Sequence, residues 1–215
     1  MTPLRIDMEI GGPMYPQAHP LHLDSLIASQ MVLAQSSPPN ETQLAQLLDT
    51  LPFERAHFGE EWVWKASAVQ FVWEGLPTHE SWTMPVSNAD LYQQIENGIV
   101  NMRGTSKIDT ARGEFKAGMG LHESRWAKSA RAWAIGDKKI LEGLLGTLHQ
   151  IGTKRRLGAG RIRSLTVNED PEASTLWANR YLPVSAKQGI PVEGTFRPPY
   201  FARDQQKMVL NNLSF

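Results

Sequence analysis

The sequence predicts an α+β fold whose core elements follow the order strand, helix, strand, strand, helix, strand. Three observations support this order. Residues 4–10 alternate strictly between apolar and charged side chains, as in a strand with one buried face. Residues 138–151 carry apolar side chains at helical spacing. Residues 161–167 follow a glycine-rich loop and are rich in β-branched residues, which favours a strand.

The N-terminal part supplies the first strand and the first helix. In the strand, four apolar residues face the same way: Leu4, Ile6, Met8 and Ile10. Residues 11–20 form a loop with three prolines and two glycines, and Pro20 is well placed to open a helix. An apolar stripe then continues at helical spacing to about residue 34, and residues 41–51 predict a second short helix.

The middle of the chain is expected to add a strand and an insertion. Residues 61–73 are aromatic and β-branched, which predicts a long or bent strand. Residues 77–87 are expected to form a loop, and residues 89–100 a short helix. Residues 102–117 are basic and punctuated by glycine, which indicates an extended hairpin or a mobile insertion, with the best strand candidate at residues 113–124.

The C-terminal part completes the predicted core. The pattern of residues 125–135 assigns neither a helix nor a strand. Asp137 is a suitable N-cap for the predicted helix at residues 138–151. Residues 176–184 and 194–202 are two further strand candidates, and together they predict an added β-hairpin.

This element order is that of the ferredoxin-like fold, with the pattern β-α-β-β-α-β. The same topology underlies the RNA-recognition domain (RRM), whose open sheet face binds RNA. We therefore expect a single ferredoxin-like (RRM-like) domain over residues 1–215. An inserted helix and a basic segment are expected at about residues 75–131, and a C-terminal β-hairpin is added to the core.

Composition excludes several classes of protein. A mean hydropathy of -0.35 argues against a membrane protein, and no apolar run approaches the roughly 20 residues of a spanning helix. The N-terminal MTPLRIDMEIGG carries acidic residues where a secretion signal would be basic and then apolar. Zero cysteines exclude disulfides and thiolate metal sites, and they fit a cytoplasmic protein.

Charge is divided unevenly along the chain, although the net charge is zero. Residues 1–99 contain 3 Lys/Arg and 12 Asp/Glu, whereas residues 100–163 contain 14 Lys/Arg and 5 Asp/Glu. Residues 164–215 contain 5 of each. The basic middle part favours a nucleic-acid partner. The acidic first part indicates either repulsion of nucleic acid there or a basic protein neighbour.

The strongest single feature is the sequence GTKRRLGAGRIR at residues 152–163, which we call the basic loop. Its three glycines, Gly152, Gly158 and Gly160, allow close approach of the backbone to a ligand and positive φ, and exposed amides in such a loop can form an anion-binding concavity. It also contains five cations, and these are Lys154, Arg155, Arg156, Arg161 and Arg163.

Two nucleotide-binding motifs are excluded at the basic loop. A Walker A loop requires a Lys-Ser/Thr pair, but Gly158 is followed by Ala159 and Gly160. A dinucleotide-binding loop lies after a strand and before a helix, whereas here the order is reversed and Arg163 stands in place of the third glycine. The remaining interpretations are a site for a nucleic-acid backbone or a solvated basic loop.

Two segments resemble a known family. The helix end and loop HQIGTKRRLGAGRIRSL resemble the G-loop signature of the RAMP superfamily of CRISPR effector subunits. The first strand followed by PLHLDSLIASQMVLAQ resembles the opening of the five-prime-handle-binding subunit of type IV CRISPR complexes. This resemblance implies a subunit that caps one end of a guide-RNA ribonucleoprotein and grips the repeat-derived 5′ handle. Its neighbours would be the CRISPR backbone and large subunits, and it would meet target DNA only through the complex.

The resemblance also implies roles for individual residues. Gly152, Gly158 and Gly160 would shape the loop against the RNA backbone, and its cations would contact phosphates. The basic segment at residues 102–131 would correspond, by position and charge, to the family's thumb-like insertion. In that segment cations alternate with aromatic rings, as single-stranded RNA binding requires. The candidates there are Arg112, Lys116, His122 and Arg125, with Phe115, Trp126 and Trp133 nearby. The alternative is a solvated face with both tryptophans in the core.

Two other functions stay open. A metal-independent endoribonuclease that processes guide precursors would need a histidine as general acid or base, and His122 or His149 could serve. These histidines form no visible constellation in the sequence, so we expect no catalytic residue. The third alternative is a ferredoxin-like interaction module whose basic face meets an acidic protein.

No metal or cofactor is expected. His19 and His22 have the spacing of a metal pair, with Asp24 and Asp7 as possible neighbours, but a third ligand cannot be placed. Helix capping or packing is the preferred interpretation for these histidines. The tryptophans at positions 62, 64 and 73 are expected in the core or at a subunit interface.

Overall fold

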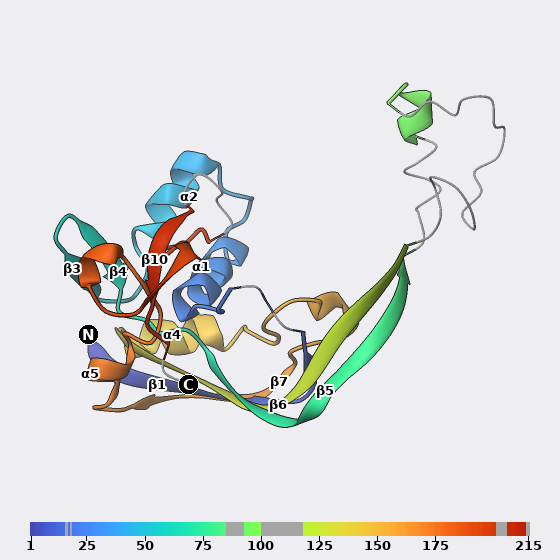
Figure 1. Ribbon diagram of the computed structural model, residues 1–215. Helices are drawn as coiled ribbons and strands as arrows, with labels where there is room; N and C mark the ends of the chain where they lie inside the picture. The colour runs from blue at the N-terminus through green and yellow to red at the C-terminus, as the bar shows by residue number, and fades with distance from the viewer. Residues whose placement is uncertain (16, 18, 85–92, 100–117, 201–205, 214–215) are drawn as a thin grey trace. The chain divides into compact units, whose positions relative to one another are not determined.

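The computed structural model describes residues 1–15, 17, 19–84, 93–99, 118–200 and 206–213. The chain divides into two compact units, one formed by Met1–Leu76 with Arg125–Phe215 and the other by Pro77–Ser124 (Figure 1). The boundary of the second unit falls inside the insertion predicted at residues 75–131. Arg112, Lys116 and most of the predicted basic segment lie outside the described residues.

The main sheet of the first unit is built around β1 (Thr2–Ile10). It pairs antiparallel with β6 (Gly118–Gly136) along one edge and with β7 (Ile162–Glu169) along the other. The strands β2 (Pro13–Met14) and β5 (Gln70–Met84) both pair with β6. As predicted, β1 buries one face, formed by Leu4, Ile6, Met8 and Ile10.

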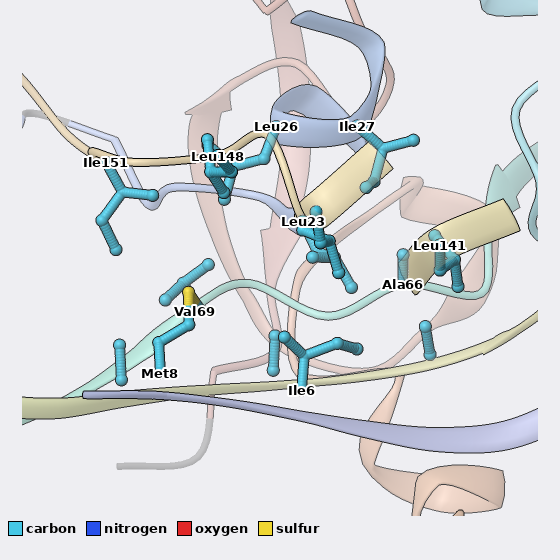
Figure 2. Packing of buried hydrophobic residues seen from close by; sticks show 14 of the residues in the cluster. Ile6, Met8, Leu23, Leu26, Ile27, Ala66, Val69, Leu141, Leu148 and Ile151 are labelled. Atoms are coloured by element: carbon cyan, nitrogen blue, oxygen red, sulfur yellow. The ribbon is translucent and has the colours of Figure 1, made fainter. Parts of the chain in front are cut away.

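Two helices cover the buried face of this sheet, namely α1 (Leu23–Leu33) and α4 (Lys138–Leu145). Figure 2 shows Ile6 and Met8 of β1 pointing toward the space that Leu23 of α1 and Leu141 of α4 also enter. The short helix α2 (Glu41–Leu48) packs against α1 and begins at a capping box between Asn40 and Gln43.

The predicted helix at residues 138–151 is shorter in the structure. Asp137 caps it as expected, since its carboxylate accepts a hydrogen bond of 3.0 Å from the amide of Ile140. The helix stops at Leu145, and Leu148 and Ile151 reach the core from the chain beyond it (Figure 2). Leu148 and Ile151 are therefore apolar because they are buried in the core, and not because they belong to the helix.

A second, smaller core lies between two further sheets. The hairpin of β3 (Arg55–Phe58) and β4 (Glu61–Trp64) faces a three-stranded sheet. That sheet has the order β8 (Tyr181–Leu182), β10 (Lys207–Asn211), β9 (Ile190–Gly194). The short helices α5 (Ala173–Leu176) and η3 (Val184–Ala186) flank β8 in the sequence.

Several predicted elements of the middle and of the tail are corrected by the structure. Residues 61–73 do not form one strand, because β4 ends at Trp64 and β5 begins at Gln70 in a different sheet. The predicted loop at residues 77–87 is strand as far as Met84, because the chain pairs with β6 there. Residues 125–135, which the pattern did not assign, belong to β6.

In the tail, only Tyr181 and Leu182 of the predicted strand at residues 176–184 are strand, since α5 extends to Leu176 and residues 177–180 form turns and bends. The predicted strand at residues 194–202 is wrong for its described part, because β9 ends at Gly194. A C-terminal antiparallel pair nevertheless exists, formed by β9 and β10.

The second unit contains the outer parts of β5 and β6 and a helical turn at residues 93–96, within the predicted helix at 89–100. Ser124 donates a hydrogen bond of 2.9 Å to Glu80, and His79 lies 3.9 Å from the carboxylate of Glu123. Among the described residues of the whole chain, no helix is long and apolar enough to cross a membrane.

Candidate nucleic-acid interface

The basic loop connects the buried segment after α4 to β7, and its glycines are required by its backbone. Gly152, Gly158 and Gly160 all adopt positive φ, at 83°, 84° and 62°. A Cβ on Gly160 would collide with the carbonyl oxygen of Ile151, and one on Gly152 would lie 2.7 Å from the Met14 methyl. At Gly160 no other residue type fits without moving the backbone, because its Cβ would meet a backbone carbonyl as well as requiring positive φ.

The two ends of the loop are fixed by hydrogen bonds. The amide of Ile151 donates to the carbonyl of Gly160 at 2.9 Å, and Ile162 donates to His149 at 2.9 Å. The chain before α1 also holds this end of the loop, because the amide of Gly160 donates a hydrogen bond of 3.0 Å to the carbonyl of Pro13. The base of the loop is therefore a small ladder attached to the main sheet.

The tip of the loop is a single 3₁₀ turn, η2 (Arg155–Leu157). Lys154 precedes it with φ of 58°, an unusual value for a residue with a side chain. The amides of Leu157, Gly158 and Gly160 all donate to backbone carbonyls of the protein. These three amides are thus not available to an anion.

The cations of the loop fall into two groups. Arg155, Arg156 and Arg161 are exposed, and none of them forms an ion pair with a carboxylate in the described part of the chain. The other two have contacts within the protein. Lys154 Nζ lies 4.9 Å from the ring centroid of Tyr15, and Arg163 lies 3.6 Å from the Glu9 carboxylate.

Arg125 of β6 is linked to the basic loop by way of β2. In the pairing of β2 with β6, Arg125 lies opposite Met14, and Met14 in turn contacts Gly152 of the basic loop. The Arg125 guanidinium lies 5.3 Å from the ring centroid of Trp73. The structure therefore brings Arg125 to the basic loop, whereas His122 belongs to the second unit.

Comparison with known proteins identifies the chain's family. The family model for CRISPR type IV associated protein Csf3 matches residues 2–212. The chain belongs to the Csf3 family. This match covers both segments from which a type IV CRISPR subunit was predicted, and it confirms that prediction. No curated protein matches the chain.

One face of the main sheet is covered by α1 and α4 (Figure 1). On the other face of the sheet in this Csf3-family chain, charged side chains pair with one another. Asp7 of β1 accepts hydrogen bonds from Arg5 at 2.8 Å and from Arg131 at 2.7 Å. Arg5 also lies 3.2 Å from Asp170. Arg131, the last residue of the predicted basic segment, is thus engaged with a carboxylate.

The histidines are separated in the fold. His149 is exposed next to the basic loop, while His122 lies in the second unit. His22 is only 1% exposed and its ring stacks on Tyr200 with centroids 4.5 Å apart, which confirms the packing interpretation. Burial lowers the pKa of His22 well below its usual value, so the ring is neutral. Within the described segments, no group of three or more His, Asp or Glu side chains could hold a metal ion.

The structure also contains a buried ion pair that the sequence did not reveal. Arg180 is fully buried and donates to Asp24 of α1 at 2.9 Å. It also donates to the carbonyls of Trp64, Ala66 and Phe196 at 2.6, 2.7 and 2.8 Å. The Tyr200 hydroxyl accepts from Arg180 and donates to Asp24 at 3.0 Å. We call Asp24, Arg180, Tyr200 and His22 the buried cluster.

The buried cluster connects parts of the chain that are far apart in sequence. Its bonds attach α1 to the segment between β4 and β5 and to the C-terminal tail. Asp24 is therefore a structural partner of Arg180. No local pattern could have predicted this pair, because 156 positions separate its two members.

Proposed function

We propose that this Csf3-family chain is the RNA-binding subunit of its type IV complex and grips the 5′ repeat-derived handle of the guide RNA with the basic loop. In this role it caps the complex, adjoins the CRISPR backbone and large subunits, and meets target DNA only through them in DNA-targeting defence. It acts by binding and without catalysis.

The arrangement of the main sheet supports a ferredoxin-like core for this function. β1 lies between β6 and β7, β5 pairs with the outer edge of β6, and the β1 pairings are antiparallel. The helices α1 and α4 cover one face. This is the strand order expected when a β-α-β-β-α-β chain forms one sheet.

The observation that carries the proposal is the set of exposed, unpaired guanidinium groups on a loop of fixed conformation. Arg155, Arg156 and Arg161 have no carboxylate partner among the described residues, so no carboxylate in that part of the chain neutralises their charge. Because hydrogen bonds hold the loop backbone, binding of a phosphate backbone has to order the arginine side chains but not the loop itself.

The opposite sheet face is a poorer candidate for RNA. In an RRM this face binds RNA, but here its cations Arg5 and Arg131 already contact Asp7. A phosphate would have to displace a carboxylate from each of them. The basic loop offers charge without this competition.

Charge reversal at the loop tests the proposal. We expect Arg155→Glu with Arg156→Glu to weaken binding of the guide RNA at least about 30-fold, because two attractions become repulsions. The matched control is Lys138→Glu with Lys139→Glu on α4, which changes the net charge equally at a different site. Unchanged RNA affinity in a folded loop variant would refute the assignment of the loop.

A further inference from the structure

A hollow lined by aromatic rings lies beside the basic loop, within the first unit. Its volume is about 620 Å³, and its rings come from three distant parts of the chain. Such a volume falls within the range of roughly 300–1,000 Å³ that is typical of ligand sites. The residues that define this aromatic pocket are Tyr15, Phe71, Trp73, Tyr181, Gln17 and Asn211.

The pocket adjoins the cations of the candidate interface. Lys154 of the basic loop lies over Tyr15, with 4.9 Å between Nζ and the ring centroid. Arg125 lies over Trp73 at 5.3 Å. Both cations therefore lie against rings that line the pocket.

Of its four rings, Tyr15 and Tyr181 are buried and Phe71 packs against the main core, whereas Trp73 is exposed. Trp73 keeps 38% of its surface exposed, and Phe71, half-buried, lies 5.2 Å from it in a tilted arrangement. Exposed aromatic surface in a concave site beside cations is typical of surfaces that stack unpaired bases. Gln17 and Asn211 also line the pocket, and their side-chain amides can meet the edge of a base.

We propose that the aromatic pocket receives one unpaired nucleobase of the guide RNA, next to the phosphates held by the basic loop. This inference rests on the proposed function, because it requires RNA at the loop. The base stacks on Trp73 and Phe71, and Lys154 and Arg125 hold the phosphates on either side of it. The pocket then fixes the position of the RNA, whereas the loop supplies most of the affinity.

A protein side chain would be the competing occupant, since an apolar residue of another subunit also fits an aromatic hollow. The two cations favour the nucleotide, because they can pair with its phosphates. An apolar side chain would offer them no partner and would cover part of their hydration shell.

The test combines abasic RNA with a variant of Trp73. The guide RNA recovered from the complex is sequenced, and its 5′ handle is synthesised as a series with one abasic site at each position. We expect one position to lose about 10-fold or more in affinity for the wild-type chain when its base is removed, since base stacking is worth about that much. For Trp73→Ala the same abasic site should cost less than about twofold, because the ring that it meets is already absent.

Two controls separate this proposal from the proposed function. Trp177→Ala removes the tryptophan at the C-cap of α5, which lies outside the pocket, and should leave the abasic pattern unchanged. Trp73→Phe keeps a ring and should restore most of the sensitivity. Thermal melting of each variant checks folding.

The outcomes are distinguishable. If every abasic site has the same effect on the wild type and on Trp73→Ala while binding still depends on Arg155 and Arg156, the base pocket is refuted and the proposed function stands. If binding does not depend on the loop either, both are refuted. If a photoreactive group placed at Trp73 in the assembled complex crosslinks to another subunit and not to RNA, the pocket is a protein-docking site and the proposal is overturned.

Discussion

The buried cluster and the basic loop both contain arginines, but the guanidinium is buried in the cluster and exposed to solvent in the loop. Arg180 is fully buried and donates hydrogen bonds to a carboxylate, a hydroxyl and several carbonyls. Arg155 and Arg156 are exposed and have no acidic partner in the described part of the chain. A buried charge must be compensated inside the protein, so Arg180 serves the fold. An exposed charge that is left uncompensated is available to a partner.

Between these extremes lies the paired face of the main sheet, where Arg5 and Arg131 contact Asp7. The arginines thus differ in partner and burial, and these differences do not follow their position in the sequence. The changes below test these differences in order of decreasing expected effect.

Replacement of Arg180 should have the largest effect on stability. Arg180→Met leaves Asp24 buried without its cation and releases the carbonyls of Trp64, Ala66 and Phe196, so we expect a loss of about 3–5 kcal/mol in the free energy of unfolding. Chemical denaturation measures this loss. Adding Asp24→Asn should recover part of it, because the uncompensated charge is removed. A variant as stable as the wild type would contradict a structural role for the pair.

Glycine replacements in the basic loop should separate the cost of a steric clash from the cost of a left-handed backbone. Gly160→Ala places a Cβ against the carbonyl of Ile151, and we expect it to cost about 3 kcal/mol or more. Gly158→Ala also has positive φ, but its Cβ would meet nothing within 4 Å, so a cost of about 1–2 kcal/mol is expected from the left-handed backbone alone. Equal melting temperatures for the two variants would show that the base of the loop is not fixed as described.

Lowering the pH should destabilise the protein through His22. Its pKa in the folded state lies well below the usual value because the ring is buried, whereas the unfolded chain binds a proton near pH 6.5. Below about pH 6.5 the unfolded state therefore takes up the proton first, and His22 removes up to about 1.4 kcal/mol of stability for each further pH unit. In His22→Phe the decrease in stability between pH 6.5 and pH 5 should be smaller. An identical pH profile would show that His22 is not buried as a neutral ring.

Loss of a paired surface cation should have the smallest effect. Arg131→Ala removes an exposed ion pair with Asp7, so we expect a loss of at most about 1 kcal/mol in stability. RNA affinity should stay within about twofold of wild type, since Arg131 already has a carboxylate partner. A loss comparable to that of the loop variants would mean that RNA reaches the sheet face.

The sequence was informative where structure is set by neighbouring residues. The alternation in residues 4–10 predicted β1, the spacing from Leu23 to Met31 predicted α1, and the glycines of the basic loop predicted its left-handed turns. The two segments that resembled a type IV CRISPR subunit identified the family.

Other features could not be predicted, because they depend on contacts between distant residues. β5 continues through Gly75 and Pro77, residues that favour a turn, because β6 provides a pairing partner. Arg180 carried no signal that it would lie beside Asp24. In the same way, Tyr15, Trp73 and Tyr181 meet at the aromatic pocket only through the tertiary fold.

Whether the loop arginines hold the RNA can be measured from the salt dependence of RNA binding by the wild type and by Arg155→Ala with Arg156→Ala. Each phosphate neutralised on a single strand adds about 0.7 to the slope of log affinity against log salt. We predict that the double variant reduces this slope by roughly 1.4, whereas Arg131→Ala leaves it unchanged. A slope that is unaffected by the loop variant, or one that falls with Arg131→Ala instead, would contradict the claim that the unpaired arginines of the basic loop hold the RNA.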